Sequence, residues 1–528
     1  MTAELTVIIA PPPTPNGDLH VGHLSGPYLG ADVLRRYLTL QGRDAVAALS
    51  VDLNQSYVVT TAERLGTEPL ALARKSHADI QTTLSKSQIH FDVVAIPDTA
   101  YTQSVSDWFK HLFDTGVIEK HRRLSPFDIK RNRFMFESYA TGYCPTCLSG
   151  TKANICEACG HPNEASDLLG LYPTGGEAGD PVEMREIDEY FIDLEKWREP
   201  LLDHLRHHIP EKRPNLSRLI DELFAKRLAK FPITFPSRWG IPAPFPNADG
   251  LVLNVWAEML PGHFHWIDQA CMLRGFEGAT ARASSVRYVQ YLGFDNSFFY
   301  VIAHLGLALA ARAGGLKHIL PTAFITNEFY LLDNFKFSTS QGHLIWGRDL
   351  LAETPADDVR FYLAWSNPEY NQANFTREDM ERVLDKKFRQ PIKRVCELFG
   401  GKSGPVSGSA YAASLLARFE TAYDYRHQSL RMAALTVANG LELIESLAKH
   451  GTNTDVLRSI VKATACGLAP LASDAALKLW RSIGLDGPIF WPEGKDLLPS
   501  EPAFNGSGFQ EEASEPGSKL QLLGAVVT

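Results

Sequence analysis

Hydrophobic and polar positions along the first 115 residues follow two different spacings. Residues 5–10 are a short apolar run rich in β-branched side chains, which predicts a buried strand. A turn rich in proline and glycine follows at 11–17, and apolar residues then recur at helical spacing over 19–40. A strand, a tight turn and a helix in this order predict the opening unit of a parallel sheet covered by helices.

The same β/α pattern continues to about residue 115 and returns near residue 235. In the first part we predict strands at 45–51 and 93–96, and helices at 56–66, 69–86 and 102–115. In the second part we predict strands at 252–256, 287–292 and 323–326, and an apolar helix at 298–312. Two separated parts of the chain are therefore expected to carry the same β/α character.

The segment between these two parts has a different composition. Four close-spaced cysteines lie within 144–159, and a loose stretch rich in Gly, Glu, Asp and Pro runs to about residue 183. Residues 189–230 are charged and are predicted to be helical, with His204, His207 and His208 on a solvated helix face. We interpret the segment as an insertion and not as a continuation of the sheet.

The C-terminal part reads almost entirely as helix from residue 374, without a strong strand signal before Ile489. Residues 491–528 are rich in Pro, Gly, Ser and Glu, and we predict that this tail is largely disordered.

Composition and charge narrow the class of protein. The chain has 528 residues, 45% of them hydrophobic, so several domains with buried cores are expected. A net charge of −9 argues against a generally basic nucleic-acid coat, but not against a local basic groove. The odd count of seven cysteines argues against a disulfide-stapled secreted domain, and we find neither a signal peptide nor an 18-residue apolar stretch. We expect a cytoplasmic, soluble protein.

The cysteines at 144–159 have the spacing of a metal site. Cys144 and Cys147 form one C-x2-C pair, and Cys156 and Cys159 form another eight residues later. Two such turns can place four thiolates at the corners of a tetrahedron around Zn²⁺, which predicts a closed structural site. A disulfide pair or a redox C-x2-C motif is the alternative interpretation.

A pair of histidines marks the junction of the first strand and the first helix. His20 and His23 are three residues apart around Gly22, just after Asn16 and Gly17. On one face of a first helical turn, two imidazoles could donate hydrogen bonds to phosphate oxygens, and the helix N-terminus favours anions. In isolation the pattern would also fit a metal pair or an ordinary packed helix start.

A second candidate segment lies about 315 residues later, at 334–340. It contains Lys336, Ser338 and two further hydroxyl residues, and it follows the returning β/α part. Lys336 could reach a triphosphate. Taken alone, the string would also fit a surface loop.

Together, the histidine turn and the lysine–serine loop resemble the two signature motifs of the class I aminoacyl-tRNA synthetases. The cysteine knuckle inside the insertion makes the chain most similar to the methionyl-tRNA synthetase family, as a divergent member or a paralogue. The resemblance covers roughly residues 5–395 and includes residues 31–37, 255–258, 291–295 and 358–362. It implies an α/β fold, in which a Rossmann-type parallel sheet is split by a zinc-bearing insertion and followed by an all-α helical bundle.

The resemblance also implies how the chain divides. The expected parts are the first half of the catalytic domain at 1–117, the connective insertion at 118–232, the second half with the signature loop at 233–345, a stem-contact linker at 346–380, a helical anticodon-binding-like bundle at 381–490 and the tail at 491–528.

Site roles follow from the same resemblance. The catalytic residues would be His20, His23, Lys336 and Ser338. The residues that bind ATP would be Asn16, Gly17, Gly22, Gly293, Asp295 and Lys336. The residues around the amino acid would be Pro12, Thr14, Asp52, Trp256, Met259, Leu260, His263, Asn296 and Tyr300. The cofactors would be ATP, Mg²⁺ and a structural Zn²⁺.

The amino-acid pocket departs from the family. Trp256 keeps the family's tryptophan, and Asp52 matches the carboxylate that holds the substrate ammonium group. Thr14, Met259, Leu260, His263, Asn296 and Tyr300 differ from the family's residues at these positions. Since His263 and Asn296 would be left unpaired beside a thioether, we expect a more polar substrate than methionine. A slip of one residue in this assignment, or pairing of these side chains with each other, is the alternative.

Two further departures concern the signature loop and the bundle. Thr339 replaces the loop's second lysine, whose loss would slow adenylation by about 10²–10³-fold if nothing compensates. The region around 447–454, where the family reads the anticodon, is short and lacks tryptophan. Five basic residues could contact a tRNA backbone or simply form a solvated face: Lys386, Lys387, Arg389, Lys393 and Arg394.

The sequence therefore predicts a methionine–tRNA ligase-type enzyme, which adenylates an amino acid with ATP and transfers it to tRNA. The first alternative is a tRNA-independent ligase that passes the activated amino acid to a small amine or thiol. The second is an inactive RNA-binding paralogue. The expected partners are an amino acid and tRNA, and neither a membrane nor DNA.

Overall fold

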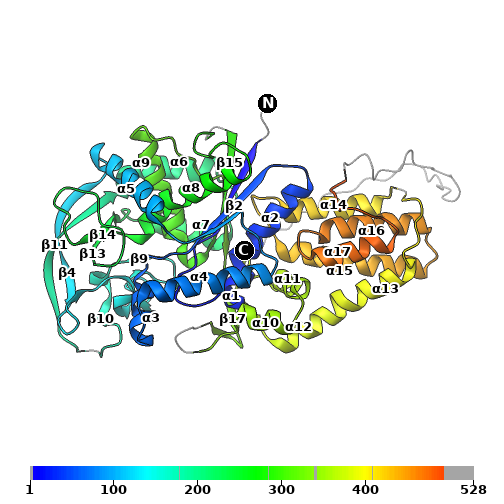
Figure 1. The fold of residues 1–528 in the computed structure, drawn as a ribbon, viewed down its shortest axis with the longest axis horizontal. Coiled ribbons are helices and arrows are strands. Elements are labelled where there is room, and N and C mark those ends of the chain that lie inside the picture. The colour runs from blue at the N-terminus through cyan, green and yellow to red at the C-terminus, as the bar shows by residue number, and fades with distance from the viewer. Residues whose placement is uncertain (1–3, 178, 283–284, 338–341, 407, 493–528) are drawn as a thin grey trace, which may run out of the picture.

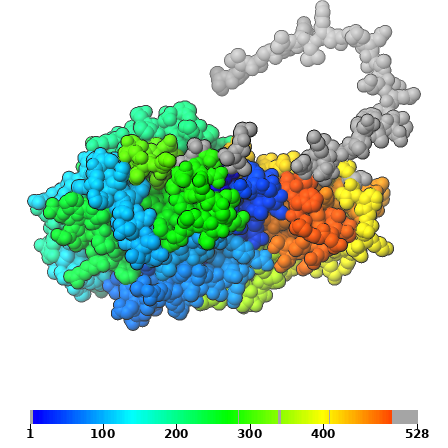
Figure 2. All heavy atoms as spheres, turned by 45° about the horizontal axis from the view of Figure 1, so that its top comes forward, coloured from blue at the N-terminus to red at the C-terminus, as the bar shows by residue number. Residues whose placement is uncertain are grey.

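The fold was analysed in a computed structural model that describes residues 4–492 except 178, 283–284, 338–341 and 407. Figure 1 shows an elongated molecule, with the mixed sheet and helix part on one side and a helical bundle on the other. The space-filling view shows the bundle as a lobe next to the N-terminal residues (Figure 2).

A five-stranded parallel sheet lies at the centre of the larger part, in the order β16-β15-β1-β2-β3. Its strands are β1 (Leu5–Ile9), β2 (Ala45–Ser50), β3 (Val93–Ala95), β15 (Val286–Gly293) and β16 (Ala323–Asn327). The two halves of the chain meet where β1 pairs with β15, with Leu5 opposite Val286. One sheet built from two separated segments confirms the predicted fold class.

Both faces of this sheet are buried. Successive side chains of a strand point to opposite sides, so one strand contributes to two cores. In β1, Ile8 lies in the core shared with the bundle, whereas Val7 and Ile9 lie in the core on the other face. The helices in the first half are α2 (Leu29–Leu40), α3 (Ser56–Leu65), α4 (Pro69–Lys86) and α5 (Thr99–Asp114), and those in the second half are α8 (Val255–Leu273) and α9 (Leu305–Ala313). Because β1 is covered on both faces, all of its side chains are apolar or buried, which explains the apolar run in the sequence.

The helix predicted over 19–40 is interrupted. The short helix α1 (Val21–His23) runs into a π-helical segment η1 (Leu24–Tyr28) before α2 begins. Pro27 lies within η1 and has no N–H to donate, and Gly26 has non-helical dihedral angles, with φ −93° and ψ −119°. The break lies directly after the histidine pair.

The insertion contains a long antiparallel ribbon, which corrects the sequence prediction. Strand β4 (Glu119–Asp128) pairs along β11 (Val182–Asp193), with β5 (Arg133–Phe134) and β12 (Lys230–Pro232) at the edges. Residues 189–193 are thus strand and not helix. Residues 198–207 and 214–224 are helical, as α6 (Arg198–His207) and α7 (Pro214–Phe224).

His204 also differs from its prediction. It is only 7% exposed, and its Nε2 lies 2.8 Å from the Pro321 carbonyl oxygen. The side chains of His207 and His208 are exposed as predicted. At 252–256 only β14 (Leu251–Leu253) is a strand, because Asn254 caps α8 by accepting the Trp256 N–H.

Small strands complete the insertion and its border. They are β6 (Ala140–Tyr143), β7 (Gly150–Lys152), β8 (Asn154–Ile155), β9 (Pro162–Asn163), β10 (Leu169–Pro173) and β13 (Thr234–Pro236). Short 3₁₀ or π turns lie at η2 (Glu137–Tyr139), η3 (Ala165–Asp167), η4 (Leu194–Trp197), η6 (Phe294–Asn296) and η7 (Phe298–His304).

A connecting region leads from the sheet to the bundle. It consists of β17 (Tyr330–Leu332), β18 (Phe335–Lys336), α10 (Gly347–Glu353), α11 (Ala356–Trp365) and β19 (Ala373–Phe375). The bundle follows with α12 (Arg377–Leu384), η8 (Asp385–Arg389), α13 (Gln390–Phe399), α14 (Ala410–Tyr423), α15 (Leu430–Lys449), α16 (Thr454–Leu468) and α17 (Ser473–Ser482). The strand β19 was not predicted, and residue 489 is not in a strand.

The end of the described chain packs on the first helix. The Trp491 ring lies edge-on to Tyr37 at 5.0 Å, and its backbone N–H donates to the Leu40 carbonyl. The predicted disordered tail therefore begins no earlier than residue 492, and residues 493–528 lie outside the described residues.

The most apolar helical stretch, Phe294–Ala313, is long enough by composition to cross a membrane. However, 83% of its most apolar 18-residue window is buried inside the protein, where it contributes to the core beside α8. A buried core helix is the simpler explanation of its hydropathy.

Candidate active site

The histidine turn lies at the carboxyl end of β1, where ligands bind in open parallel sheets. The His20 and His23 rings stack with centroids 3.7 Å apart. His20 Nδ1 accepts from the His23 N–H, and His23 Nδ1 accepts from the His20 N–H, both at 3.3 Å. Because each Nδ1 is an acceptor, the proton of each neutral ring is on Nε2, which leaves two Nε2–H donors.

Burial keeps both rings neutral. It lowers the pKa of His20 well below its usual value, with a further contribution from neighbouring His23. Burial lowers the pKa of His23 to about 4. The pair can therefore donate hydrogen bonds at neutral pH without carrying charge.

Phe337 of the predicted signature loop lies against the histidine turn. The Phe337 ring stacks on His20 with centroids 4.8 Å apart. A Cβ at Gly22 would lie 3.1 Å from both the His20 ring and the Phe337 ring, so a larger residue would crowd this contact. Backbone bonds from Val21 to Ile345 and from Gly347 to Leu19 hold the end of the loop beside the turn. Ser338, one of the predicted catalytic residues, and Thr339 lie outside the described residues.

Lys336 lies at the border between the loop and the zinc knuckle. Its Nζ is 3.5 Å from Glu157 Oε2 and 3.9 Å from the centroid of the Phe329 ring. Glu157 lies between Cys156 and Cys159, so the knuckle contacts the signature lysine directly. Sequence reasoning assigned no role to Glu157 or Phe337, although Glu157 lies within the second cysteine pair and Phe337 within the 334–340 loop.

Asp295 lies where the second half of the sheet ends. Its pKa is raised to about 7, mainly by desolvation and to a smaller extent by Glu157, while Lys336 opposes the shift. A Cβ at Gly293 would lie 2.5 Å from Asp295 Oδ1, so glycine at this position leaves room for the carboxylate. Asn16 and Gly17 are half-buried in the turn before the histidines, where Asn16 Nδ2 donates to Thr61 Oγ1 at 3.4 Å.

Three carboxyl groups gather around the predicted amino-acid pocket. They belong to Asp52, Glu137 and Glu258, and each is at most 5% exposed. Burial raises the pKa of Asp52 well above its usual value, with smaller contributions from Glu258 and Glu137. Burial likewise raises the pKa of Glu137 to about 7 and that of Glu258 to about 8. A cationic ligand group would be strongly stabilised in this environment.

The structure brings together only some of the predicted amino-acid-binding residues. Pro12, Asp52, Met259 and His263 line one small cavity, together with Ser50, Val51, Tyr101, Glu258 and Gly262. Tyr300 reaches this group by donating from its hydroxyl to Met259 Sδ at 3.6 Å. Leu260 is buried in the core, and Thr14 and Asn296 do not line the cavity.

The prediction of two unpaired polar groups is half right. His263 Nε2 is buried without a hydrogen-bond partner. Asn296, in contrast, donates from Nδ2 to Asp295 Oδ1 at 3.5 Å, so its amide has a partner.

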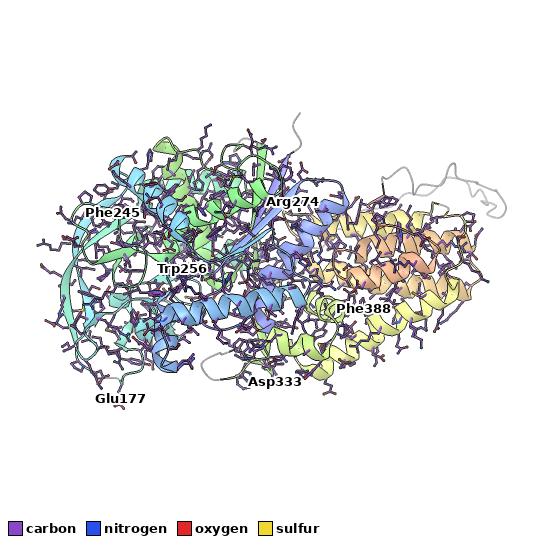
Figure 3. All side chains as sticks on the ribbon, viewed as in Figure 1. Glu177, Phe245, Trp256, Arg274, Asp333 and Phe388 are labelled. Atoms are coloured by element: carbon purple, nitrogen blue, oxygen red, sulfur yellow. The ribbon has the colours of Figure 1, made fainter. Side chains whose placement is uncertain are left out.

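Trp256 separates this pocket from a neighbouring cavity. Its ring stacks on Phe299 with centroids 4.0 Å apart, and it lies in the middle of the larger lobe (Figure 3). The neighbouring cavity extends from Trp256 and Lys336 to the strands of the knuckle at Tyr143 and Lys152. Trp256 and Lys336 thus line this second cavity, and Pro12, Asp52, Met259 and His263 line the first.

The four predicted metal ligands lie together. Their sulfur atoms are within 4.8 Å of one another, with Cys144 and Cys159 at 3.8 Å and Cys147 and Cys156 at 3.6 Å. Zinc–sulfur bonds of about 2.3 Å in a tetrahedron require sulfurs about 3.8 Å apart, and a disulfide requires about 2.05 Å. The cysteine geometry therefore fits zinc and not disulfides. Of the other three cysteines, Cys271 and Cys466 are buried and Cys396 is partly exposed.

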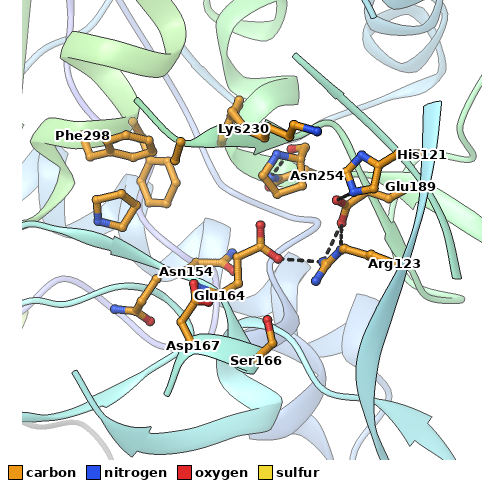
Figure 4. A pocket seen from close by; sticks show the side chains of 16 residues that line it. His121, Arg123, Asn154, Glu164, Ser166, Asp167, Glu189, Lys230, Asn254 and Phe298 are labelled. Atoms are coloured by element: carbon orange, nitrogen blue, oxygen red, sulfur yellow. Dashed lines mark hydrogen bonds and ion pairs between the residues drawn. The ribbon is translucent and has the colours of Figure 1, made fainter. Parts of the chain in front are cut away.

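A further cavity lies between the long ribbon of the insertion and the η7 segment (Figure 4). Arg123 Nη2 lies 2.7 Å from Glu164 Oε2, and Arg123 Nε donates to Glu189 Oε1 at 2.7 Å. His121 and Lys230 border the same space. Neither His20 nor His23 lines this cavity, and Arg123 is paired with Glu164 and Glu189.

The basic cluster of the bundle is mostly paired. Arg389 forms ion pairs with Asp358 and Glu381, and Arg394 forms one with Glu445. Lys386 and Lys387 are exposed, and Lys393 Nζ lies 4.0 Å from Glu397 Oε1. The turn between α15 and α16 spans residues 450–453, so the predicted short loop is present.

Comparisons with known proteins point in one direction. The family model described as "tRNA synthetases class I (M)" matches residues 6–393. A protein named "Methionine--tRNA ligase" from Chlamydia abortus is 31% identical over 418 residues, which cover 76% of this chain and 73% of that protein. Another of the same name from Pyrobaculum aerophilum is 26% identical over 518 residues, which cover 90% of this chain and 88% of that protein.

A solved structure gives the same fold. The Mycobacterium tuberculosis methionyl-tRNA synthetase in complex with methionyl-adenylate superposes with a TM-score of 0.67 at 18% identity. The match covers 95% of this chain and 99% of that one.

Proposed function

The chain belongs to the methionyl-tRNA synthetase family of class I aminoacyl-tRNA synthetases, and we propose that it uses the histidine turn, Lys336 and the Asp52 pocket to charge tRNA. In the first step, the carboxylate oxygen of the amino acid attacks the α-phosphorus of ATP and pyrophosphate leaves. In the second step, a ribose hydroxyl at the end of tRNA attacks the acyl carbon and AMP leaves.

The histidines serve the first step. Their two Nε2–H donors are fixed by the reciprocal Nδ1 bonds and stay neutral to about pH 4 in His23. Donors held in place stabilise the charge that grows on phosphate oxygens as the pyrophosphate bond breaks. Lys336, on the loop that packs against His20, supplies a positive charge for the leaving pyrophosphate.

Two carboxyl groups orient the substrates. Asp52 is buried next to Glu258, and the ammonium group of an amino acid would offset the repulsion between these carboxylates. Asp295 lies at the end of β15 and would accept from the ribose hydroxyls of ATP. Asn16, Gly17, Gly22 and Gly293 shape the backbone around the nucleotide.

The metals have separate places in this proposal. Zn²⁺ would be held by the four cysteine thiolates as a closed structural site, since such a set leaves no open position. Mg²⁺ would arrive with ATP and neutralise its phosphates. A cytoplasmic location, where tRNA charging takes place, is part of the same proposal.

The observation that carries the proposal is the stacked histidine pair beneath Phe337. The test is ATP–pyrophosphate exchange with the wild type, His20→Ala and His23→Ala, with His207→Ala on the exposed face of α6 as the control. We expect exchange in the wild type and the control, and a loss of about 10²–10³-fold in each site variant. Equal exchange in all four proteins would contradict the assigned roles.

The two alternative functions are not favoured. The family match extends through the bundle's first helices to residue 393, and the relative from Pyrobaculum aerophilum is covered over 88% of its length. Because the relatives are named methionine–tRNA ligases, methionine is the amino acid with which other substrates are to be compared.

A further inference from the structure

The amino-acid cavity is unusually small for a ligand pocket. Its free volume is about 10 Å³, roughly the space of one water molecule. Pockets for small molecules usually have roughly 300–1,000 Å³. The same space must hold the ammonium and carboxyl groups of the substrate near Asp52, so little remains for a side chain.

Met259 narrows this space. Its side chain lines the cavity and is only 5% exposed, and the Tyr300 hydroxyl holds its sulfur at 3.6 Å. The Tyr300 ring packs against the rings of His263 and His304, at centroid distances of 5.9 and 4.9 Å. The wall formed by Met259 is therefore supported from behind and cannot move aside without disturbing this aromatic packing.

Glu258 brings an unsatisfied polar atom to the cavity. Its Oε1 accepts from Asn54 Nδ2 at 2.7 Å and from the Tyr101 hydroxyl at 3.1 Å. Its Oε2 is buried without a hydrogen-bond partner, although the residue is only 2% exposed. A buried polar atom without a partner costs about 1–3 kcal/mol, which a ligand that completes the bond would recover.

The protonation state of Glu258 indicates which ligand group fits. Burial raises its pKa to about 8, so near neutral pH the carboxyl group exists in both forms. With both donors on Oε1, the proton of the acid form is on Oε2. A hydroxyl or carboxamide can accept from the acid and donate to the carboxylate, whereas a thioether is only a weak acceptor.

His263 adds a second group of this kind. Its Nε2 is buried and unpaired, and burial lowers the pKa of the ring well below its usual value. The neutral ring offers either a donor or an acceptor, depending on its tautomer.

From these contacts we propose that the pocket selects an amino acid shorter than methionine whose side chain ends in a hydroxyl or carboxamide bonded to Glu258. The inference rests on the proposed adenylation and specifies its substrate class. A site with buried polar groups rejects an analogue without the matching group, because those groups then stay unpaired.

The test is pyrophosphate exchange with matched amino acids. Homoserine and norvaline have side chains of the same length that end in a hydroxyl and a methyl group, and asparagine, serine, norleucine and methionine complete the panel. We expect homoserine, asparagine or serine to have the highest kcat/KM, and homoserine to exceed norvaline by at least about tenfold. A panel in which methionine is fastest would overturn the proposal.

Variants separate size from polarity. Met259→Ala should raise kcat/KM for methionine about tenfold or more, and Glu258→Leu should remove the preference for homoserine over norvaline. Met272→Ala on the same helix is the control, since Met272 is 62% exposed. If Glu258→Leu does not fold, the Met259→Ala result and the wild-type panel still decide.

The outcomes distinguish the two proposals. Exchange that is fastest with methionine overturns the pocket inference and leaves the proposed tRNA charging intact. Absence of exchange with every amino acid, in protein that is folded and zinc-loaded, overturns the proposed function and the pocket inference together.

Discussion

Arg360 joins the bundle to the catalytic sheet, and its replacement should be among the most damaging single changes outside the active site. Its side chain is 1% exposed and its partner Asp32 is fully buried. Nη2 donates to Asp32 Oδ2 at 2.7 Å, Nε to the Leu471 carbonyl at 2.6 Å, and Nη1 to the Gln88 carbonyl at 2.9 Å. One guanidinium thus links α11, α2 and the turn before α17.

The expected cost of Arg360→Met follows from these contacts. Removing one partner of a buried ion pair costs about 3–5 kcal/mol, because the other charge stays buried. Arg36 Nε still lies 2.8 Å from Asp32 Oδ2, so we expect the lower part of this range. A local opening that is about 3 kcal/mol easier exchanges its amide hydrogens roughly 10²-fold faster.

The assay is hydrogen exchange by mass spectrometry in peptides that cover α2 and residues 470–472. Arg382→Met is the control, because Arg382 and its partner Asp379 have side chains that are 55% and 39% exposed, and such pairs contribute at most about 1 kcal/mol. Exchange in Arg360→Met within threefold of the wild type would refute the idea that this residue fixes the bundle to the sheet.

Three further predictions follow from the site. Chelation of zinc, or Cys147→Ser, should raise the KM for ATP, because the knuckle's strands form part of the wall of the cavity that contains Lys336; metal analysis and exchange kinetics check this, and an unchanged KM in zinc-free protein would argue against a role of the knuckle in this site. Glu157→Gln should lower the KM for ATP by up to about fivefold, because it frees Lys336 from an ion pair. Glu177→Gln, at an exposed residue, serves as the control, and a raised KM in Glu157→Gln would contradict the prediction. Between about pH 4.5 and 8, the folded Glu258 carboxyl group with pKa about 8 keeps a proton that the unfolded one has lost, so the wild type loses stability as pH rises. Glu258→Gln should therefore gain stability relative to the wild type, by at most about 1.4 kcal/mol per pH unit. Melting curves with a constant difference between the two proteins would contradict this.

The sequence was sufficient for the overall plan, because the relevant signals are local. The apolar run at 5–10, the cysteine spacing and the histidine pair each determine their own surroundings. Their meeting in space was predicted only through the family resemblance, which relates β1 to β15 across about 280 residues of chain.

The errors have a common physical cause. Residues 189–193 belong to a charged segment predicted to be helical but pair as a strand, because β4 and β12 offer partner ladders that no local pattern reveals. His204 is buried because the neighbouring sheet supplies the Pro321 carbonyl. Glu258 lies in a recognised stretch of sequence, yet its missing partner at Oε2 depends on Asn54 and Tyr101 from distant segments.

The most direct test of the central claim is aminoacylation with purified protein, ATP, Mg²⁺ and tRNA, using labelled amino acids from the exchange panel. We predict that an amino acid that supports pyrophosphate exchange becomes attached to tRNA, with one AMP formed per acylated tRNA, and that His23→Ala abolishes both steps. Exchange without any acylated tRNA would contradict tRNA charging, and the absence of both would contradict the assignment of the histidine turn as an adenylation site.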